Sequence, residues 1–228
     1  KYISQFADIN DKIYTIEIVT NNSTAETKEL LLGENPLVIQ TKSENIFDEL
    51  KFRTARINLV TTEDVNDIYN PSATGTSVLI KSDNEVIFYG YVTPNVYSQN
   101  YNNPLDELEI ECIEDVSILK YYDYSTVGNE KSIITVRQLL NNIFNKIKNA
   151  YTKYYVFPNT IKLNSSVNID SIYLNENNFF DNDSEQKPWK CDEVLKELCK
   201  YFNLSCTKYK DTIYFIDYSA LKKNLTSC

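Results

Sequence analysis

Three glutamates at a spacing of two residues come nearest to a chemical site in this sequence. Glu107, Glu109 and Glu111 alternate with apolar residues. Neighbouring carboxylates can ligate a metal ion or exchange protons with a substrate. In a β-strand, however, alternate side chains stand side by side on one face with Cβ atoms roughly 7 Å apart, which keeps the carboxylates from converging. The pattern therefore predicts a half-buried antiparallel strand with a solvated acidic face.

A second acidic cluster lies in Phe179–Glu185, which contains Asp181, Asn182 and Asp183. Closely spaced carboxylate and amide oxygens are typical of calcium loops. The segment lacks the central glycine and the glutamate at the twelfth position of such a loop. We therefore expect no calcium site here.

The five cysteines are Cys112, Cys191, Cys199, Cys206 and Cys228. Their number is odd, their spacing is wide and no two form a C-x-x-C pair, so neither a disulfide framework nor a zinc site is predicted. We expect reduced, partly buried thiols in a protein made in a cytoplasm.

Aromatic residues suggest a different class of function. The single tryptophan, Trp189, and the run Tyr121–Tyr124 could stack on sugar rings, which makes a carbohydrate-binding or adhesive surface module the main alternative function. Most aromatic residues of the chain fall on alternating positions or beside expected helix starts, where packing explains them. The pattern thus favours Trp189 as a structural anchor over Trp189 as a ligand residue.

What the composition lacks excludes much enzyme chemistry. The 228 residues include no histidine and only four scattered glycines, so catalytic triads, imidazole metal sites and phosphate-binding glycine loops are absent. A hydrolase using two carboxylates needs no histidine, yet nothing among the dispersed acids selects a pair. We predict a chain that is not an enzyme, with no catalytic, cofactor-binding or metal-ligating residues and no cofactor.

Charge argues against nucleic acid as a partner. The net charge is −9, whereas phosphate-backbone binding depends on clustered lysine and arginine. The local basic run of Lys146, Lys148 and Lys153 is typical of a solvated helix end. We therefore expect no sequence-specific nucleic-acid binding.

Periodicity divides the chain into two parts. From residue 1 to about 124, apolar residues alternate, which predicts short strands and an antiparallel β-barrel or sandwich. The expected strands include Tyr14–Ile18, Arg56–Val60 and Glu85–Val92, together with Leu37–Gln40 as an edge strand after Pro36.

From about 125 to 228 the pattern predicts a smaller α+β domain. Thr135 and Gln138 have the spacing of a capping box, and an apolar stripe then predicts a helix over about 135–149. A second helix is expected over about 190–202, followed by a hairpin over about 204–217. The whole chain is thus predicted to be α+β.

The order of these features resembles tail-hub or baseplate structural proteins of tailed bacteriophages and prophages. In that family an aromatic-x-Gly-aromatic-Val strand leads through a connection to an alternating strand and a closing turn, and the second half ends in a helix and a hairpin. The matching segments here are Phe88–Pro94, Tyr97–Gln99, Glu107–Cys112, Asp115–Lys120, Trp189–Phe202 and Leu204–Leu221.

The resemblance implies a structural component of the virion tail tip or baseplate hub, assembled in the bacterial host cytoplasm. It implies oligomeric rings, often trimers, in contact with tube, distal tail, and fibre or spike proteins. No catalytic residues accompany the matched region. The acidic charge would then repel DNA passing through a central channel.

Two further expectations concern the chain's context and Gly90. A methionine-free chain that begins at Lys1 is expected to be processed or cut from a longer one. No stretch of 18 apolar residues is present, so no membrane span or export signal is expected. Gly90 should allow close backbone approach within its strand, where glycine often marks a bulge, so that Gly90→Val would lower stability or assembly.

Overall fold

A computed structural model of the chain describes residues 1–21, 26–43, 45–61, 64–94, 106–147, 154–156, 172–182, 184–210, 212–218 and 222. Several expectations fall outside these residues, including those on Lys148, Lys153, Asp183, Tyr97–Gln99 and Cys228. The chain forms two compact units. The first unit comprises Lys1–Lys42 and Phe52–Ile118, and the second comprises Ser43–Lys51 and Leu119–Cys228.

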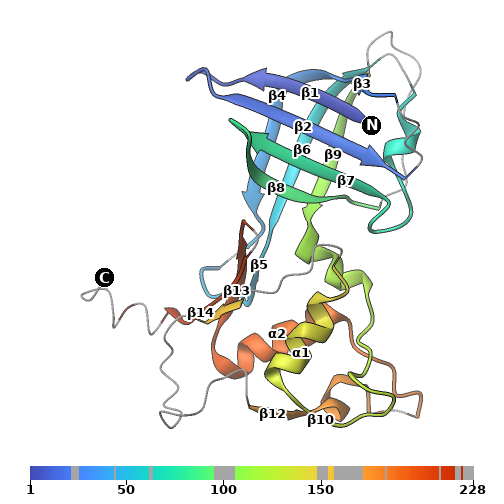
Figure 1. The fold of residues 1–228 in the computed structure, drawn as a ribbon, viewed down its shortest axis with the longest axis vertical. Coiled ribbons are helices and arrows are strands. Elements are labelled where there is room, and N and C mark those ends of the chain that lie inside the picture. Colours follow the sequence, from blue (N-terminus) through green and yellow to red (C-terminus); the bar gives the residue numbers. More distant parts are fainter. Residues whose placement is uncertain are drawn as a thin grey trace. The chain divides into compact units, whose positions relative to one another are not determined.

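The first unit is a curled, open half-barrel of eight strands (Figure 1). Neighbouring strands are antiparallel, except that β3 pairs parallel to β1. In sheet order the strands are β3 (Lys28–Glu29), β1 (Tyr2–Ala7), β2 (Ile13–Thr20), β7 (Thr76–Ser82), β8 (Glu85–Val92), β9 (Asp106–Glu114), β6 (Arg53–Thr61) and β4 (Leu31–Thr41). A short 3₁₀ helix, η1 (Asn66–Ile68), lies between β6 and β7 in the sequence.

Alternation in the sequence builds this sheet. Along β6, Ala55, Ile57 and Leu59 are buried, and the residues between them are half-buried. Their apolar side chains pack with those of the neighbouring strands, including Ile110 of β9 and Phe88 of β8. Burial of alternate residues on one sheet face is the main stabilising contribution. The predicted α+β class with an N-terminal β-rich part is confirmed.

Strand β4 lies at one edge of the half-barrel, as expected for a strand that contains Pro36. Its pairing with β6 is interrupted between Leu32 and Leu37, so that Pro36 falls in the irregular stretch. At the opposite edge, β3 contributes only two residues and pairs with Tyr2 and Ile3 of β1. The sheet therefore ends in one long and one short edge strand.

Gly90 has a tight environment in β8. A Cβ atom at this position would lie 2.0 Å from the carbonyl oxygen of Ile113 in β9, a separation that backbone atoms cannot accommodate. The irregularity in β8 falls earlier, between the pairs Ile80–Phe88 and Lys81–Val86. Close backbone approach, and not a bulge at Gly90 itself, is therefore the reason for this glycine.

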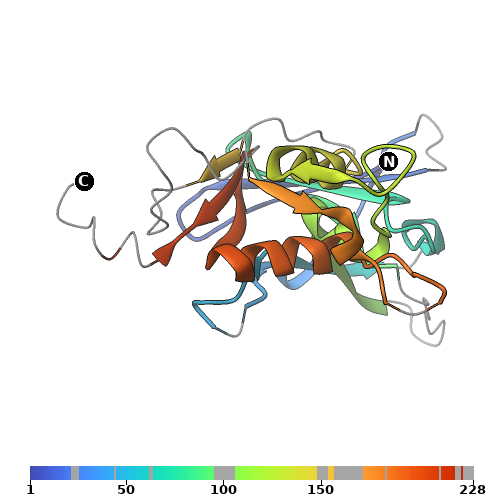
Figure 2. The same cartoon turned by 90° about the horizontal axis from the view of Figure 1, so that it is seen from below.

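The second unit contains two small sheets and two α-helices, which contact each other (Figures 1 and 2). One sheet has the order β11-β14-β13-β5, and the other pairs β10 with β12. The strands are β5 (Leu50–Lys51), β10 (Ile133–Thr135), β11 (Tyr154–Val156), β12 (Tyr173–Asn175), β13 (Ser205–Tyr209) and β14 (Thr212–Ile216). The helices are α1 (Val136–Phe144) and α2 (Cys191–Phe202), with 3₁₀ helices η2 (Asp115–Tyr121), which begins in the first unit, and η4 (Glu176–Phe179).

Local sequence sets the helix ends. Thr135 Oγ1 accepts a hydrogen bond from the Gln138 amide at 3.2 Å, and Gln138 Oε1 accepts one from the Thr135 amide at 2.8 Å, completing the capping box. Helix α1 ends earlier than the expected residue 149, and Ile147 is buried from the turn that follows. Helix α2 ends at Phe202 and is followed by its C-cap, Asn203, which adopts a left-handed conformation.

The four described cysteines, Cys112, Cys191, Cys199 and Cys206, are buried thiols that form no disulfide with one another. Burial raises the pKa of the Cys191 thiol to about 11, and it raises the pKa of Cys112 as well. A thiol with a raised pKa is a poor nucleophile at neutral pH. Cys112 and Cys191 therefore behave as small apolar side chains.

Candidate functional site

A groove of about 890 Å³ lies in the second unit beside the start of α2. Trp189 and Pro188 line it together with charged residues. Trp189 is half-buried, so part of its indole remains accessible. This groove is the concave feature that holds the single tryptophan of the chain.

The segment before α2 is fixed on both sides. The Trp189 amide donates to the Phe179 carbonyl at 3.0 Å, and the Trp189 carbonyl accepts from the Tyr124 amide at 2.8 Å. Isolated antiparallel β-bridges also join Phe180 with Pro188 and Asp123 with Lys190. Segments distant in the sequence therefore hold the tryptophan backbone in place.

The indole ring has a partner of its own. Trp189 Nε1–H donates to Asp181 Oδ1 at 3.0 Å. A buried or half-buried indole N–H usually requires such an acceptor. Asp181, which the sequence placed in a possible calcium loop, instead orients the tryptophan.

Four of the eight charged residues that line the groove form two ion pairs. Lys190 Nζ lies 2.6 Å from Asp123 Oδ1, and Lys200 Nζ lies 2.6 Å from Glu197 Oε1. Each carboxylate raises the pKa of the lysine that it accepts a hydrogen bond from. Glu193 accepts from the Lys190 amide at 2.8 Å and so caps α2.

The lining as a whole is electrically neutral. Four lysines and four carboxylates surround the groove, whereas the whole chain carries a net charge of −9. Among the described residues, Lys196 makes no ion pair or hydrogen bond with another side chain. The groove therefore offers both donors and acceptors without attracting one sign of charge.

Tyr124 belongs to the core and does not line this groove. Its ring packs edge-on against Phe179 with centroids 5.2 Å apart, and its hydroxyl donates to Glu176 Oε1 at 2.6 Å. Burial and the neighbouring Glu176 carboxylate raise the pKa of Tyr124. Of the Tyr121–Tyr124 run considered for sugar stacking, only Asp123 reaches the groove.

Glu176 is a buried carboxylate with a full set of donors. Besides Tyr124, it accepts from the Val127 amide at 2.8 Å and from the Ser132 amide and hydroxyl at 2.9 and 3.1 Å. Burial raises the pKa of this carboxyl, but the hydrogen bonds together outweigh that effect and hold its pKa below the ordinary value. Glu176 thus ties the loop after Tyr124 to η4.

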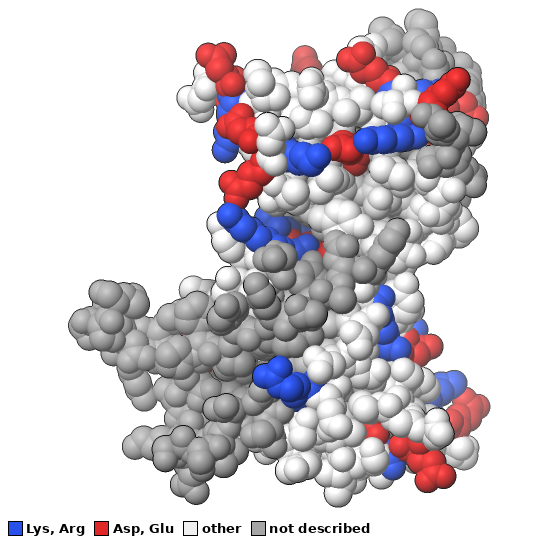
Figure 3. Space-filling view, viewed as in Figure 1, with Lys and Arg blue, Asp and Glu red and all other residues white. Residues whose placement is uncertain are grey.

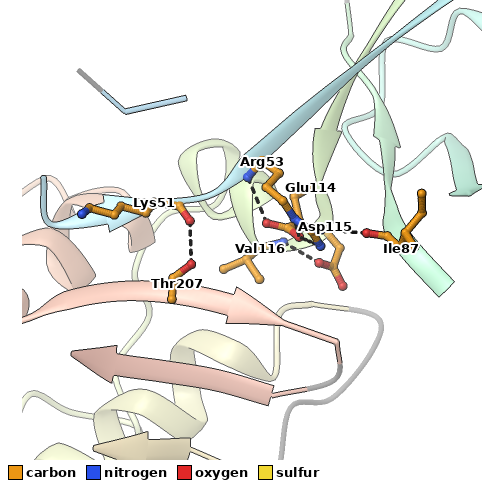
Figure 4. Close-up of polar contacts among 7 residues, drawn as sticks. All are labelled: Lys51, Arg53, Ile87, Glu114, Asp115, Val116 and Thr207. Atoms are coloured by element: carbon orange, nitrogen blue, oxygen red, sulfur yellow. Dashed lines mark hydrogen bonds and ion pairs between the residues drawn. The ribbon is translucent and has the colours of Figure 1, made fainter. Parts of the chain in front are cut away.

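Glu114 is a second buried carboxylate, and its contact with Arg53 joins three strands of the first unit (Figure 4). Arg53, at the start of β6, donates through Nη2 and Nε to Glu114 Oε1 at 2.6 and 2.9 Å, and its amide donates to Glu114 Oε2 at 3.0 Å. Arg53 Nη1 also reaches the Ile87 carbonyl of β8 at 2.7 Å. In the second unit, the Thr207 hydroxyl likewise holds β13 to the Lys51 carbonyl at 3.0 Å. Both arrangements position backbone, and neither presents a reactive group.

The three glutamates that opened the sequence analysis do not form a site. Glu107, Glu109 and Glu111 lie on the exposed face of β9, and Glu109 makes a 3.5 Å ion pair with Arg56 of β6. Within the described segments, no three His, Cys, Asp or Glu side chains come together as a metal site would require. Acidic and basic side chains are interspersed on the face drawn in Figure 3.

The basic run and the expectation of no membrane span can each be compared with the described residues. Lys146 donates to the Ser125 hydroxyl at 2.9 Å and so belongs to the second unit's own contacts. Within the described segments, every helix is too short or too polar to traverse a lipid bilayer.

Comparison of the whole fold with known proteins finds a clear similarity. The tail protein from Neisseria meningitidis MC58 superposes with a TM-score of 0.50 at 10% sequence identity, covering 90% of this chain and 52% of that one. The chain has the fold of a phage tail protein. No family model matches the sequence, and no curated protein matches it.

Two further solved structures are similar. The prophage MuSo2 43 kDa tail protein from Shewanella oneidensis has a TM-score of 0.48 at 9% identity, covering 78% of this chain and 47% of that one. The prophage tail protein gp18 from Listeria monocytogenes EGD-e has a TM-score of 0.44 at 10% identity, covering 81% and 44%. This chain therefore spans about half the length of the solved tail proteins that it matches.

Proposed function

We propose that this chain is a structural component of a phage tail tip or baseplate hub that forms oligomeric rings. The observation that carries the proposal is the fold shared with the Neisseria meningitidis tail protein across 90% of the chain. The role is architectural and involves no reaction. The proposed partners are other tail proteins, namely tube, distal tail, and fibre or spike proteins, in a virion assembled in the bacterial cytoplasm.

The open half-barrel supports the ring part of this proposal. Among the strands that the structure describes, β4 pairs with β6 alone, so the backbone groups on its other side are available to another strand. Leu31 and Val38 of β4 are apolar and exposed, Leu31 to 65%. An exposed apolar edge of this length is a natural site for strand addition from a second copy.

The test is mass in solution by light scattering, measured over a concentration series on this chain and on the full-length parent. A trimer or another defined ring that persists on dilution is the expected result for the parent. A strict monomer for both would contradict the proposal. A monomer for this chain alone would move the ring contacts outside residues 1–228 and would contradict the assignment to β4.

A further inference from the structure

We propose that the groove beside Trp189 is a binding site for a neutral oligosaccharide. The proposal concerns the second unit alone and is independent of ring formation. It adds a ligand-binding activity to an architectural chain. Three features of the groove carry it: a fixed aromatic ring, a neutral polar lining and a suitable volume.

The tryptophan is held ready before any ligand arrives. Its backbone is hydrogen-bonded on both sides, to Phe179 and to Tyr124, and its indole N–H is committed to Asp181. Trp189 lines the groove and is only half-buried, and an indole ring is an apolar surface against which the C–H groups of a sugar ring can stack. A preorganised ring lowers the entropy lost on binding.

The lining favours neither anionic nor cationic ligands. Four lysines and four carboxylates balance, so the groove exerts no net attraction on an anion or a cation. Carboxylates accept hydrogen bonds, and ammonium groups donate them. A ligand that both donates and accepts through many uncharged hydroxyl groups fits such a surface.

The size of the groove agrees with this class of ligand. Its volume of about 890 Å³ lies within the range of small-molecule sites, roughly 300–1,000 Å³. Among the residues that the structure describes, Lys196 has no side-chain partner to give up. It is therefore available to donate to a sugar hydroxyl without breaking an ion pair.

The chain carries its own reporter for the experiment. Trp189 is the only tryptophan, so intrinsic tryptophan fluorescence reports on this groove and nothing else. The full chain is first screened on a printed array of neutral and charged oligosaccharides. The best neutral probe is then titrated against the chain, and saturable change in the emission of Trp189 is the expected result.

Variants separate the groove from the rest of the surface. Trp189→Ala and Lys196→Ala should each weaken binding of the chosen probe about tenfold or more, measured by calorimetry. The matched control is Tyr201→Ala, which removes an exposed aromatic residue of α2 that does not line the groove. Circular dichroism verifies that each variant folds. If Trp189→Ala does not fold, Lys196→Ala still tests the site.

Several outcomes would overturn the inference. No neutral oligosaccharide on the array binds, or the probe binds without changing the emission of Trp189. Equal affinity in the wild type and in Lys196→Ala would place the site elsewhere. If a charged peptide binds at the groove and no sugar competes with it, the groove is a docking site for protein instead.

Discussion

Of the four glycines, Gly90 leaves the least space for an added Cβ atom. The nearest atoms to an added Cβ are the backbone oxygen and carbon of Ile113, at 2.0 and 2.9 Å, and backbone within a paired strand cannot move aside without loss of pairing. Gly33 is a strand glycine with ordinary space, because its added Cβ would meet Val60 Cγ2 at 3.4 Å. The two glycines therefore form a matched pair for testing close approach.

We expect Gly90→Ala to lower the free energy of unfolding by about 3 kcal/mol or more, because overpacking forces the strands apart. Gly33→Ala should leave it within about 0.5 kcal/mol. Denaturant unfolding of both variants measures the difference. Equal stability of the two would show that the β8–β9 contact is not as tight as the geometry indicates.

Glu176 makes stability depend on pH. Its folded pKa lies below the ordinary value of 4.5, so the ionised form stabilises the folded state. This contribution is present above pH 4.5 and is lost as the pH falls through the lowered pKa. Glu176→Gln should lower the free energy of unfolding by about 2 kcal/mol at neutral pH. The stability of this variant should also decline less on acidification than that of the wild type.

The control for this prediction is Glu107→Gln, which alters an exposed glutamate of β9. Unfolding by guanidinium at several values between about pH 7 and pH 2 is the measurement, because the contribution of Glu176 is lost below pH 4.5. A pH profile of Glu176→Gln parallel to that of the wild type would assign the acid sensitivity to other carboxylates.

At the scale of elements, Arg53 joins three neighbouring strands through one side chain. It contacts Glu114 of β9 and the Ile87 carbonyl of β8. Removing the cation takes the charged partner away from the buried Glu114 carboxylate, which costs about 3–5 kcal/mol. We expect Arg53→Met to destabilise the first unit by an amount in that range, measured by denaturant unfolding.

Arg56→Met provides the comparison for Arg53→Met. Arg56 pairs with Glu109 at 3.5 Å, and both side chains are over 40% exposed, so loss of this pair should cost no more than about 1 kcal/mol. A similar cost for both substitutions would mean that burial of Glu114 does not strengthen its ion pair. The double substitution Arg53→Met with Glu114→Leu should recover part of the loss.

Local sequence predicts the elements better than it predicts their partners. The Thr135–Gln138 spacing locates the start of α1, because a capping box depends on neighbours in the chain. Nothing in Leu50–Lys51 indicates that this short strand pairs with β13 of the second unit. The Arg53–Glu114 contact joins residues 61 positions apart, which no local pattern encodes.

The candidate site follows the same rule. Trp189 stands out in the sequence as the only tryptophan, but the acceptor of its indole N–H and the neutrality of its surroundings depend on tertiary placement. Asp181 appears in the sequence as part of an acidic cluster and acts in the structure as the partner of that indole. Residue type thus indicated where to look, and only the fold indicated what the residues do.

For the whole molecule, the proposed ring formation through the outer side of β4 makes a testable prediction. We expect the double substitution Leu31→Lys and Val38→Lys to reduce the mass of the full-length assembly to that of a monomer, because exposed lysines on an edge strand oppose pairing with another strand. Light scattering gives the mass, and circular dichroism verifies that the fold persists. Ile9→Lys is the control, since Ile9 is an apolar residue 99% exposed between β1 and β2. An assembly that survives the double substitution would place the contact between copies on a surface other than β4.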